Sequence, residues 1–219
     1  MSKSNPVIQS KSSQLNLSKW CLRLSWIISI TVCVLAIRAW GGSYGWRLQL
    51  DSYVLFPLFG LTAFSLMWSH YVASVLRQWW QLDKQVLRGY FEATSLMVLA
   101  LICLHPGLLI YQLFRDGHGL PPGSYEHYVA PGLAWVTLLG TVSWLIFISY
   151  EFRRRFQSRS WWRYVEMAVD LAMLAIFYHG LRLGSQLQQG WFRLVWYFYG
   201  VTLVLMLGYI YSKKLEKPA

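Results

Sequence analysis

Charged residues are scarce in this sequence. They make up 13% of its 219 residues, and only nine of them are acidic, whereas an ordinary soluble domain carries about a quarter charged residues. Hydrophobic residues make up 56%, and the few charges stand in clusters between long apolar stretches, as a bilayer requires. This distribution excludes an ordinary soluble domain and predicts an integral membrane protein surrounded by membrane lipids.

The shortage of acidic residues leaves a net charge of +11. Such a charge could indicate a nucleic-acid partner, but no basic helix or basic–aromatic surface motif supports one. Basic loops on the cytoplasmic side of a membrane protein account for the charge. We therefore expect no nucleic-acid partner.

The sequence also lacks metal-binding or redox cysteine motifs and nucleotide-binding motifs. Cys21, Cys33 and Cys103 show no CxxC or metal-ligand spacing, which favours small buried hydrophobes over redox or zinc chemistry. No Gly-x-Gly-x-x-Gly motif is present, so we expect the chain not to oxidise NAD(P)H by itself. The first apolar run is not followed by an A-x-A-like site, and we expect no cleavable signal peptide.

What the sequence does contain is six apolar stretches, each near the roughly 20 residues that span a bilayer core. They are Trp20–Trp40, Tyr53–Leu76, Gly89–Phe114, Val129–Tyr150, Tyr164–Leu183 and Trp191–Tyr211. We predict an all-α bundle of six transmembrane helices in one domain, residues 19–212. A disordered cytoplasmic N-terminus (1–18) and a cytoplasmic tail (213–219) flank it, and the sequence shows no internal repeat.

Lys and Arg are unevenly distributed among the loops and ends. Fifteen lie at the two termini and in the second and fourth loops, and five lie in the first, third and fifth loops. Because basic loops stay on the cytoplasmic side, we predict that both termini are cytoplasmic, in a bacterial inner membrane.

Ionisable residues inside spans are costly and are candidates for function. They are His70, Glu92, His105, Glu166, Asp170 and His179. His105 lies 17 residues beyond Arg88 and His179 lies 16 beyond Arg163, so each stands about 25 Å along a helix that starts at the cytoplasmic face. Two histidines at one depth on parallel helices suit the axial ligands of a b-type haem. The alternative is that each histidine only bonds a neighbouring helix.

Two arginines stand near the outer ends of these helices. Arg182 follows His179 by one turn, and Arg115 lies past the third span. Either could pair with a haem propionate, because Arg binds carboxylates well. Ordinary extension of a long side chain to the interface explains them equally well.

Three segments resemble one family. Residues 88–105, which begin Arg-Gly and end Leu-His, resemble the third helix of the ferric reductase-like transmembrane domain family. Residues 132–149, which begin Gly-Leu-Ala-Trp, resemble its fourth helix, and residues 162–179 resemble its fifth. The likeness covers roughly residues 50–185. That family includes the membrane haem subunit of the periplasmic methionine-sulfoxide reductase system and the membrane cores of NADPH oxidases. The resemblance implies a six-helix haem bundle; in the sulfoxide-reductase system the electrons pass to a periplasmic enzyme.

The sequence departs from that family at the inner level. The family pairs histidines about 13 or 14 residues apart on the third and fifth helices, which gives an inner and an outer haem. Here Glu92 and Phe91 precede His105 at that distance, and Glu166 precedes His179. The outer pair is present and the inner pair is missing, so one haem is expected.

Carboxylates stand where the inner ligands would be. Glu92, Glu166 and Asp170 lie at this level with His70 nearby, and Glu166 and Asp170 share a helical face. One hypothesis is a proton-handling or quinol-binding site; the other is that these carboxylates pair with Arg88 or Arg163 at the headgroup level. His70 should lie too near the cytoplasmic side to share an iron with either His105 or His179.

These observations predict a membrane electron-transfer subunit with one outer haem and with no flavin domain of its own. Electrons would come from a quinol, from a bound flavin such as FMN, or from a separate reductase, and pass to a redox partner protein on the outer face. The alternative is a non-catalytic membrane subunit or assembly factor that retains the fold. Whether the chain is itself an oxidoreductase stays open, and a small transporter is disfavoured because no inverted repeat is seen.

Overall fold

The computed structural model describes residues 6–46, 51–152 and 156–215, with the side chains of residues 6–13 and 215 left out. Its long helices are α1 (Pro6–Ser43), α2 (Ser52–Trp79), α3 (Arg88–Arg115), α4 (Ala134–Tyr150), α6 (Trp162–Leu183) and α7 (Trp191–Leu215). Three short 3-10 helices join them: η1 (Lys84–Leu87), η2 (Gly123–His127) and η3 (Ser185–Leu187). Six basic residues used for the orientation lie outside the described residues: Lys3, Arg47, Arg153, Arg154, Arg155 and Lys217.

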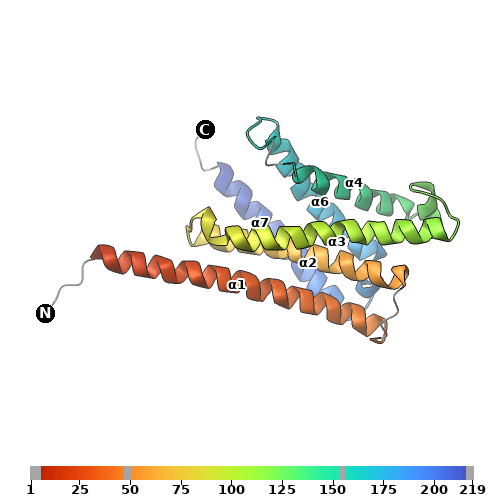
Figure 1. The fold of residues 1–219 in the computed structure, drawn as a ribbon, viewed down its shortest axis with the longest axis horizontal. Coiled ribbons are helices and arrows are strands. Elements are labelled where there is room, and N and C mark those ends of the chain that lie inside the picture. Colours follow the sequence, from red (N-terminus) through yellow and green to blue (C-terminus); the bar gives the residue numbers. More distant parts are fainter. Residues whose placement is uncertain (1–5, 47–50, 153–155, 216–219) are drawn as a thin grey trace.

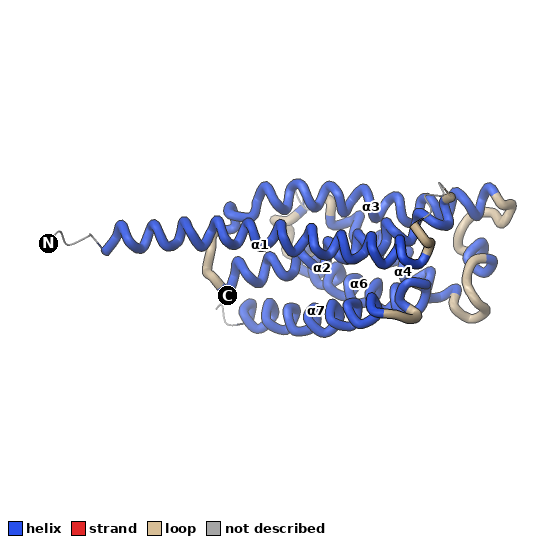
Figure 2. Tube along the Cα trace, turned by 90° about the horizontal axis from the view of Figure 1, so that it is seen from below, coloured by secondary structure: helices blue, strands red, loops and turns tan. Residues whose placement is uncertain are grey.

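The long helices lie side by side and alternate in direction (Figures 1 and 2). α1 begins and α7 ends at the same end of the bundle, and the first turns of α1 project beyond its neighbours. α2 packs along α1 and α3, whereas α4 packs mainly on α6. The α2–α3 pair and the α4–α6 pair touch each other at few places. The space between these two pairs contains the candidate site.

The outer surface of this bundle is apolar. Leu96, Leu171 and Leu194 are 68%, 65% and 71% exposed, and each belongs to a different helix. Among the described residues, five helices are long and apolar enough to cross a membrane, and α4 is a shorter apolar helix of 17 residues. This is the architecture of a helical membrane protein, with lipid against the outward-facing side chains.

Two boundaries differ from the sequence predictions. Helix α1 begins at Pro6, so the disorder predicted for residues 1–18 is wrong for residues 6–18. No Gly or Pro stands between residues 7 and 40, and an established helix extends at little cost, with Pro favoured at its first position. The fourth span was expected from Val129, but α4 begins at Ala134, because Pro131 and Gly132, at φ +82°, form a turn before it.

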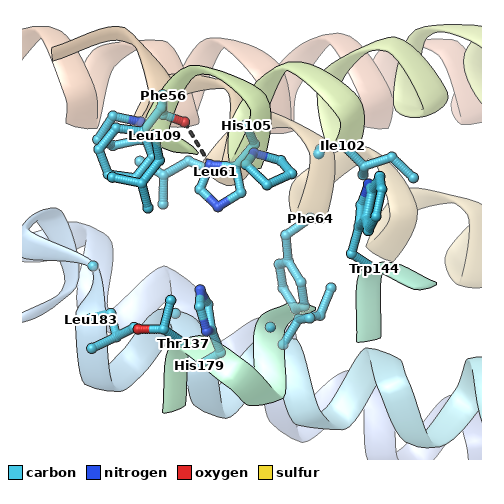
Figure 3. A pocket seen from close by; sticks show the side chains of 18 of the residues that line it. Phe56, Leu61, Phe64, Ile102, His105, Leu109, Thr137, Trp144, His179 and Leu183 are labelled. Carbon is cyan, nitrogen blue, oxygen red and sulfur yellow. Dashed lines mark hydrogen bonds between the residues drawn. The ribbon is translucent and has the colours of Figure 1, made fainter. Parts of the chain in front are cut away.

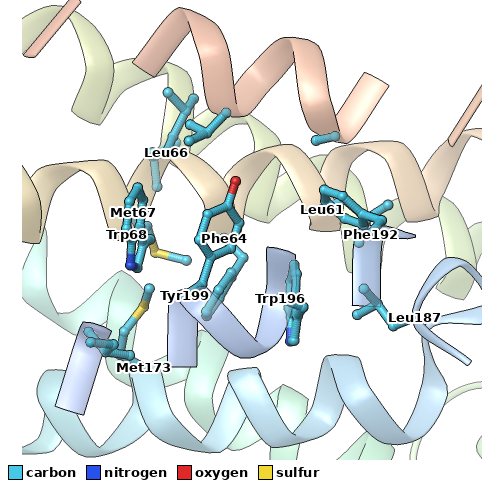
Figure 4. Close-up of a cluster of buried hydrophobic side chains, with 14 of the residues drawn as sticks. Leu61, Phe64, Leu66, Met67, Trp68, Met173, Leu187, Phe192, Trp196 and Tyr199 are labelled. Atoms are coloured by element: carbon cyan, nitrogen blue, oxygen red, sulfur yellow. The ribbon is translucent and has the colours of Figure 1, made fainter. Parts of the chain in front are cut away.

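An aromatic cluster fills the interior between α2 and α7 (Figure 4). Trp68 stacks on Tyr199 with ring centroids 4.5 Å apart, and Phe64 stacks on Trp196 at 4.3 Å. Stacked pairs of this kind stabilise packing beyond the area they bury. Trp68 also donates from Nε1 to Oγ1 of Thr202, 2.9 Å away. Because Trp68 and Tyr199 are nearly fully buried, side chains occupy the interior on the inner side of the candidate site.

Candidate functional site

A cavity of about 330 Å³ lies between the two helix pairs. Residues of α2, α3, α4 and α6 line most of it, and Trp196 of α7 and residues of the connecting segments, including Tyr128 and Gln186, complete the lining. His105 on α3 and His179 on α6 enter it from opposite sides (Figure 3). The structure thus brings together the two residues that the sequence singled out, in a space whose volume lies in the range typical of cofactor sites.

A backbone carbonyl fixes each imidazole. Nδ1 of His105 lies 2.7 Å from the carbonyl oxygen of Phe56, and Nδ1 of His179 lies 2.8 Å from that of Val136. A carbonyl oxygen only accepts hydrogen bonds, so the proton of each neutral ring must stand on Nδ1. Nε2 then carries a lone pair, and no hydrogen bond within the described residues engages it. Both histidines therefore have the tautomer of a metal ligand with an oriented second nitrogen.

A glycine lies against each imidazole. A Cβ atom on Gly60 would stand 2.7 Å from Cε1 of His105, and one on Gly140 would stand 2.6 Å from Cε1 of His179. No real Cβ atom tolerates such a contact, so only glycine fits at these positions. Gly60 follows Phe56 by four residues, and Gly140 follows Val136 by four. One turn of the neighbouring helix thus supplies both the carbonyl oxygen and the gap that each ring occupies.

Many lining positions of the two halves of the cavity correspond in register. Positions in 57–67 of α2 match positions in 137–147 of α4 with a constant shift of 80, and positions in 102–110 of α3 match positions in 176–184, which cover the end of α6 and the residue after it, with a shift of 74. The matched pairs that line the cavity are Pro57 and Thr137, Gly60 and Gly140, Leu61 and Thr141, Phe64 and Trp144, Met67 and Phe147, Ile102 and Ile176, His105 and His179, Pro106 and Gly180, Leu109 and Leu183, and Ile110 and Gly184.

Four of these ten pairs are identical residues, so the correspondence lies in the register of the lining positions and is not a repeat of the sequence. The pattern Ile-x-x-His-x-x-x-Leu occurs at Ile102–Leu109 and again at Ile176–Leu183. Gly60 and Gly140 are site residues that the sequence alone did not indicate.

His70 lies at another level of the bundle. Its Nε2 is 2.8 Å from Oγ1 of Thr94, and its ring packs edge-on against Tyr90 and Phe91. Thr94 precedes His105 by 11 residues on α3, which is about 16 Å of helix. The geometry therefore separates His70 from the cavity, as the depth argument expected.

The inner carboxylates do not gather at one point. Glu92 pairs with Arg88, 2.9 Å away, with both side chains more than half exposed. An oxygen of Glu166 lies 3.8 Å from Nζ of Lys214, a residue of α7, so its ion-pair partner differs from the predicted Arg163. Both glutamates thus form an ion pair with a basic residue, as the second hypothesis predicted. The partner is the predicted arginine for Glu92 and a lysine for Glu166.

Asp170 has partners that the sequence did not indicate. Tyr71 of α2 donates to one carboxylate oxygen at 2.7 Å, and Tyr211 of α7 donates to the other at 2.8 Å. Three helices therefore meet at this carboxylate, which is partly buried. Hydrogen bonds between helices stabilise membrane bundles modestly, and this set joins α6 to α2 and α7.

Arg115 and Arg182 do not stand beside the histidine pair. Both side chains are exposed, and neither lines the cavity. The polar residues that line the end of the cavity near the α1–α2, α3–α4 and α6–α7 connections are uncharged, and they include Tyr44, Tyr128 and Gln186. The two arginines therefore do not belong to the wall of the cavity that the histidines enter.

The donor set tests which metal group the cavity fits. Among the described residues, no three His, Cys, Asp or Glu side chains gather as they would around a bare metal ion. Two opposed imidazoles with apolar surroundings fit an iron porphyrin, which needs only axial ligands from the protein. The glycine contacts and the fixed tautomers agree with that fit.

Comparison with models of known protein families, with curated proteins and with solved structures finds no match to this chain.

Proposed function

We propose that this chain is a membrane electron-transfer subunit that holds one b-type haem between His105 and His179, near the outer face of the membrane. The observation that carries the proposal is the matched geometry of the two rings, each with Nδ1 bonded to a carbonyl and Nε2 left as a ligand. A haem held in this way takes up and gives back one electron.

The residues around the pair support this role. The carbonyls of Phe56 and Val136 hold the rings in orientation and raise the basicity of Nε2. Gly60 and Gly140 allow the rings to lie against the neighbouring helices. Phe64, with Met67 and Phe147 of the next turns, makes the inner part of the cavity apolar and thus keeps water from it.

The arrangement of the helices supports a single haem in a six-span bundle. α4, at 17 residues, is near the lower limit for a span, and we infer that it is the sixth. With six spans, both termini share one side, and the basic loops make that side the cytoplasm of a bacterial cell. The packed rings of Trp68 and Tyr199 leave little room for a second haem farther inward.

A quinol, FMN or a separate reductase would supply the electrons, and a partner protein on the outer face would receive them. His105 lies 17 residues from the start of α3 and ten from its end, so the pair stands nearer the outer loops. This position favours a protein acceptor on the outer side.

The visible spectrum of the purified protein tests the proposal. We expect bis-histidine bands, one haem per chain, and loss of haem in both His105→Ala and His179→Ala. His70→Ala is the matched control, because that ring lies outside the cavity, and it should keep its haem. A stable, colourless protein from haem-replete cells would refute the proposal.

A second candidate function is a non-catalytic membrane subunit or assembly factor. The partners of the three carboxylates favour it. Glu92 and Glu166 pair with basic side chains, and Asp170 accepts hydrogen bonds from two tyrosines. Such contacts suit a role in packing the helices together. A folded protein that binds no haem but copurifies with another membrane protein would support this second candidate.

A further inference from the structure

Most of the polar side chains that line the cavity between the helix pairs lie toward its outer end. In the proposed orientation, α2 and α4 run inward from the outer loops. Phe64 and Trp144, with Met67 and Phe147 one turn later, therefore line the inner part of the cavity. Gln186, which follows the outer end of α6, lines the outer part together with Tyr128 of the loop before α4. A ligand in this cavity would therefore meet mainly aromatic and aliphatic side chains on its inner edge, where Nε1 of Trp144 is a polar atom, and several polar side chains on its outer edge.

Gln186 is the most unusual of these polar groups. It lies in η3 and is only 4% exposed, yet neither its Nε2 nor its Oε1 has a hydrogen-bond partner among the described residues. A buried amide without partners is costly, because both atoms lose their hydrogen bonds to water. Such a group indicates a missing partner that both accepts and donates hydrogen bonds.

The corresponding residue of the other helix pair has no such need. Gln112 follows His105 by seven residues, as Gln186 follows His179 by seven. Gln112 is also 4% exposed, but its Nε2 donates to Oδ1 of Asp116 at 2.9 Å. Gln112 does not line the cavity, whereas Gln186 does. The two halves therefore match in their histidines and glycines and differ in the hydrogen bonding of this glutamine.

A second unpartnered group lies on the same side of the cavity. Oγ1 of Thr137 is buried without a hydrogen-bond partner among the described residues, and Thr137 lines the cavity next to Val136, whose carbonyl holds His179. The matched position in α2 is Pro57, which offers no side-chain polar atom. Nε1 of Trp144, deeper in α4, is also buried without a partner among the described residues and lines the cavity. The wall formed by α4 and η3 thus carries these unsatisfied groups, and only Gln186 offers both a donor and an acceptor.

We propose that Gln186 binds a carboxyl group on the outer edge of the porphyrin, and that this contact takes the place of the arginine contact expected from the sequence. This inference rests on the proposed haem site. An amide matches a carboxyl group well, since Nε2–H donates to the carboxyl C=O, and a protonated carboxyl O–H donates to Oε1. No cationic side chain lines the cavity, and a low-dielectric site without a counter-charge favours the neutral acid.

The test measures the release of two iron porphyrins from the purified full chain to an excess of a haem-scavenging protein. One is haem b, and the other is iron etioporphyrin, which has the same ring but no carboxyl groups. We expect Gln186→Leu to release haem b about five- to tenfold faster than the wild type, as the loss of a hydrogen bond of this kind implies. Its release of iron etioporphyrin should equal that of the wild type.

Gln112→Leu is the matched control, because that residue occupies the equivalent place without facing the cavity, and its release of haem b should be unchanged. If Gln186→Leu does not accumulate, Gln186→Met keeps the length of the side chain without the amide. Equal acceleration for both porphyrins would show that Gln186 only packs, and no acceleration for either would likewise overturn the inference. A wild-type chain that binds neither porphyrin would refute the haem site itself, and the inference with it.

Discussion

Gly140 lies so close to His179 that a Cβ atom at residue 140 would stand 2.6 Å from Cε1 of the imidazole. The imidazole of His179 also donates its Nδ1 proton to the carbonyl oxygen of Val136. Val136 lies in α4, one turn before Gly140. Backbone atoms of α4 thus contact this imidazole at two places. Gly60 and the carbonyl of Phe56 contact His105 in the same way, and the ring of Phe56 packs beside that imidazole as well.

Gly60→Ala and Gly140→Ala should each displace an imidazole and reduce haem content severalfold. The new methyl group must push the ring off its carbonyl partner or move two packed helices, and overpacking of this kind costs about 1–3 kcal/mol. Haem per chain, measured from the visible spectrum, checks the prediction. Gly208→Ala in α7 is the control, because a Cβ atom there meets nothing within 4 Å, and it should bind haem as the wild type does.

Asp170→Leu should lower stability without changing the spectrum of the chemically reduced protein. The substitution leaves the hydroxyls of Tyr71 and Tyr211 without their acceptor, and each unsatisfied group costs about 1–3 kcal/mol. Thermal unfolding in detergent measures the loss. Tyr71→Phe removes one hydroxyl and one bond together and should be milder. If Asp170→Asn instead abolishes reduction by a quinol while dithionite still reduces the haem fully, the carboxylate belongs to a quinol site.

Asp116 should make the C-terminal end of α3 sensitive to acid. Hydrogen bonds from Tyr53 and Gln112, both 2.9 Å long, hold the pKa of its carboxyl below the ordinary value near 3.8. The folded state therefore binds this proton less tightly than the unfolded chain does. Its stabilising contribution is complete above the ordinary pKa and is lost as the pH falls through the folded pKa.

Melting temperatures between pH 3 and pH 7 check this dependence. The wild type should lose stability toward pH 3, and Asp116→Asn should be less stable at pH 7 and change less with pH. Identical slopes for the two proteins would contradict the assignment.

Tyr90→Phe should loosen the contact among α1, α2 and α3. The Tyr90 hydroxyl lies 2.8 Å from Oγ of Ser29 and 3.2 Å from Oγ of Ser69, while the two serines remain bonded to each other at 2.9 Å. Hydrogen bonds between membrane helices contribute about 0.6 kcal/mol each on average, so we expect a loss near 1 kcal/mol. Chemical unfolding in mixed micelles measures it, and a change above 3 kcal/mol would indicate a larger role for the hydroxyl.

The sequence predicts the helices well because length and hydropathy are local properties. Five of the six predicted spans lie within long apolar helices, whereas the start of α4 depended on the turn at Pro131 and Gly132. The pairing of His105 with His179 followed from depth, since equal distances along two parallel helices bring side chains to one level.

The rest of the site depends on which helices pack together. The carbonyl of Phe56 reaches His105 only because α2 lies against α3, and no spacing along the chain reveals that contact. Asp170 finds its partners on α2 and α7, far away in sequence. The exposed positions of Arg115 and Arg182 likewise follow from how the helices rotate about their axes, which charge alone does not specify.

Each half of the candidate site belongs to a single helical hairpin. The α2–α3 hairpin contains His105 with its carbonyl and its glycine, and the α4–α6 hairpin contains the same set for His179. During synthesis, each hairpin can therefore orient its own ligand as soon as it is inserted, before the other exists. A haem bound between His105 and His179, as proposed, would then bridge two hairpins that are already folded. Its binding would require that the second hairpin had inserted beside the first.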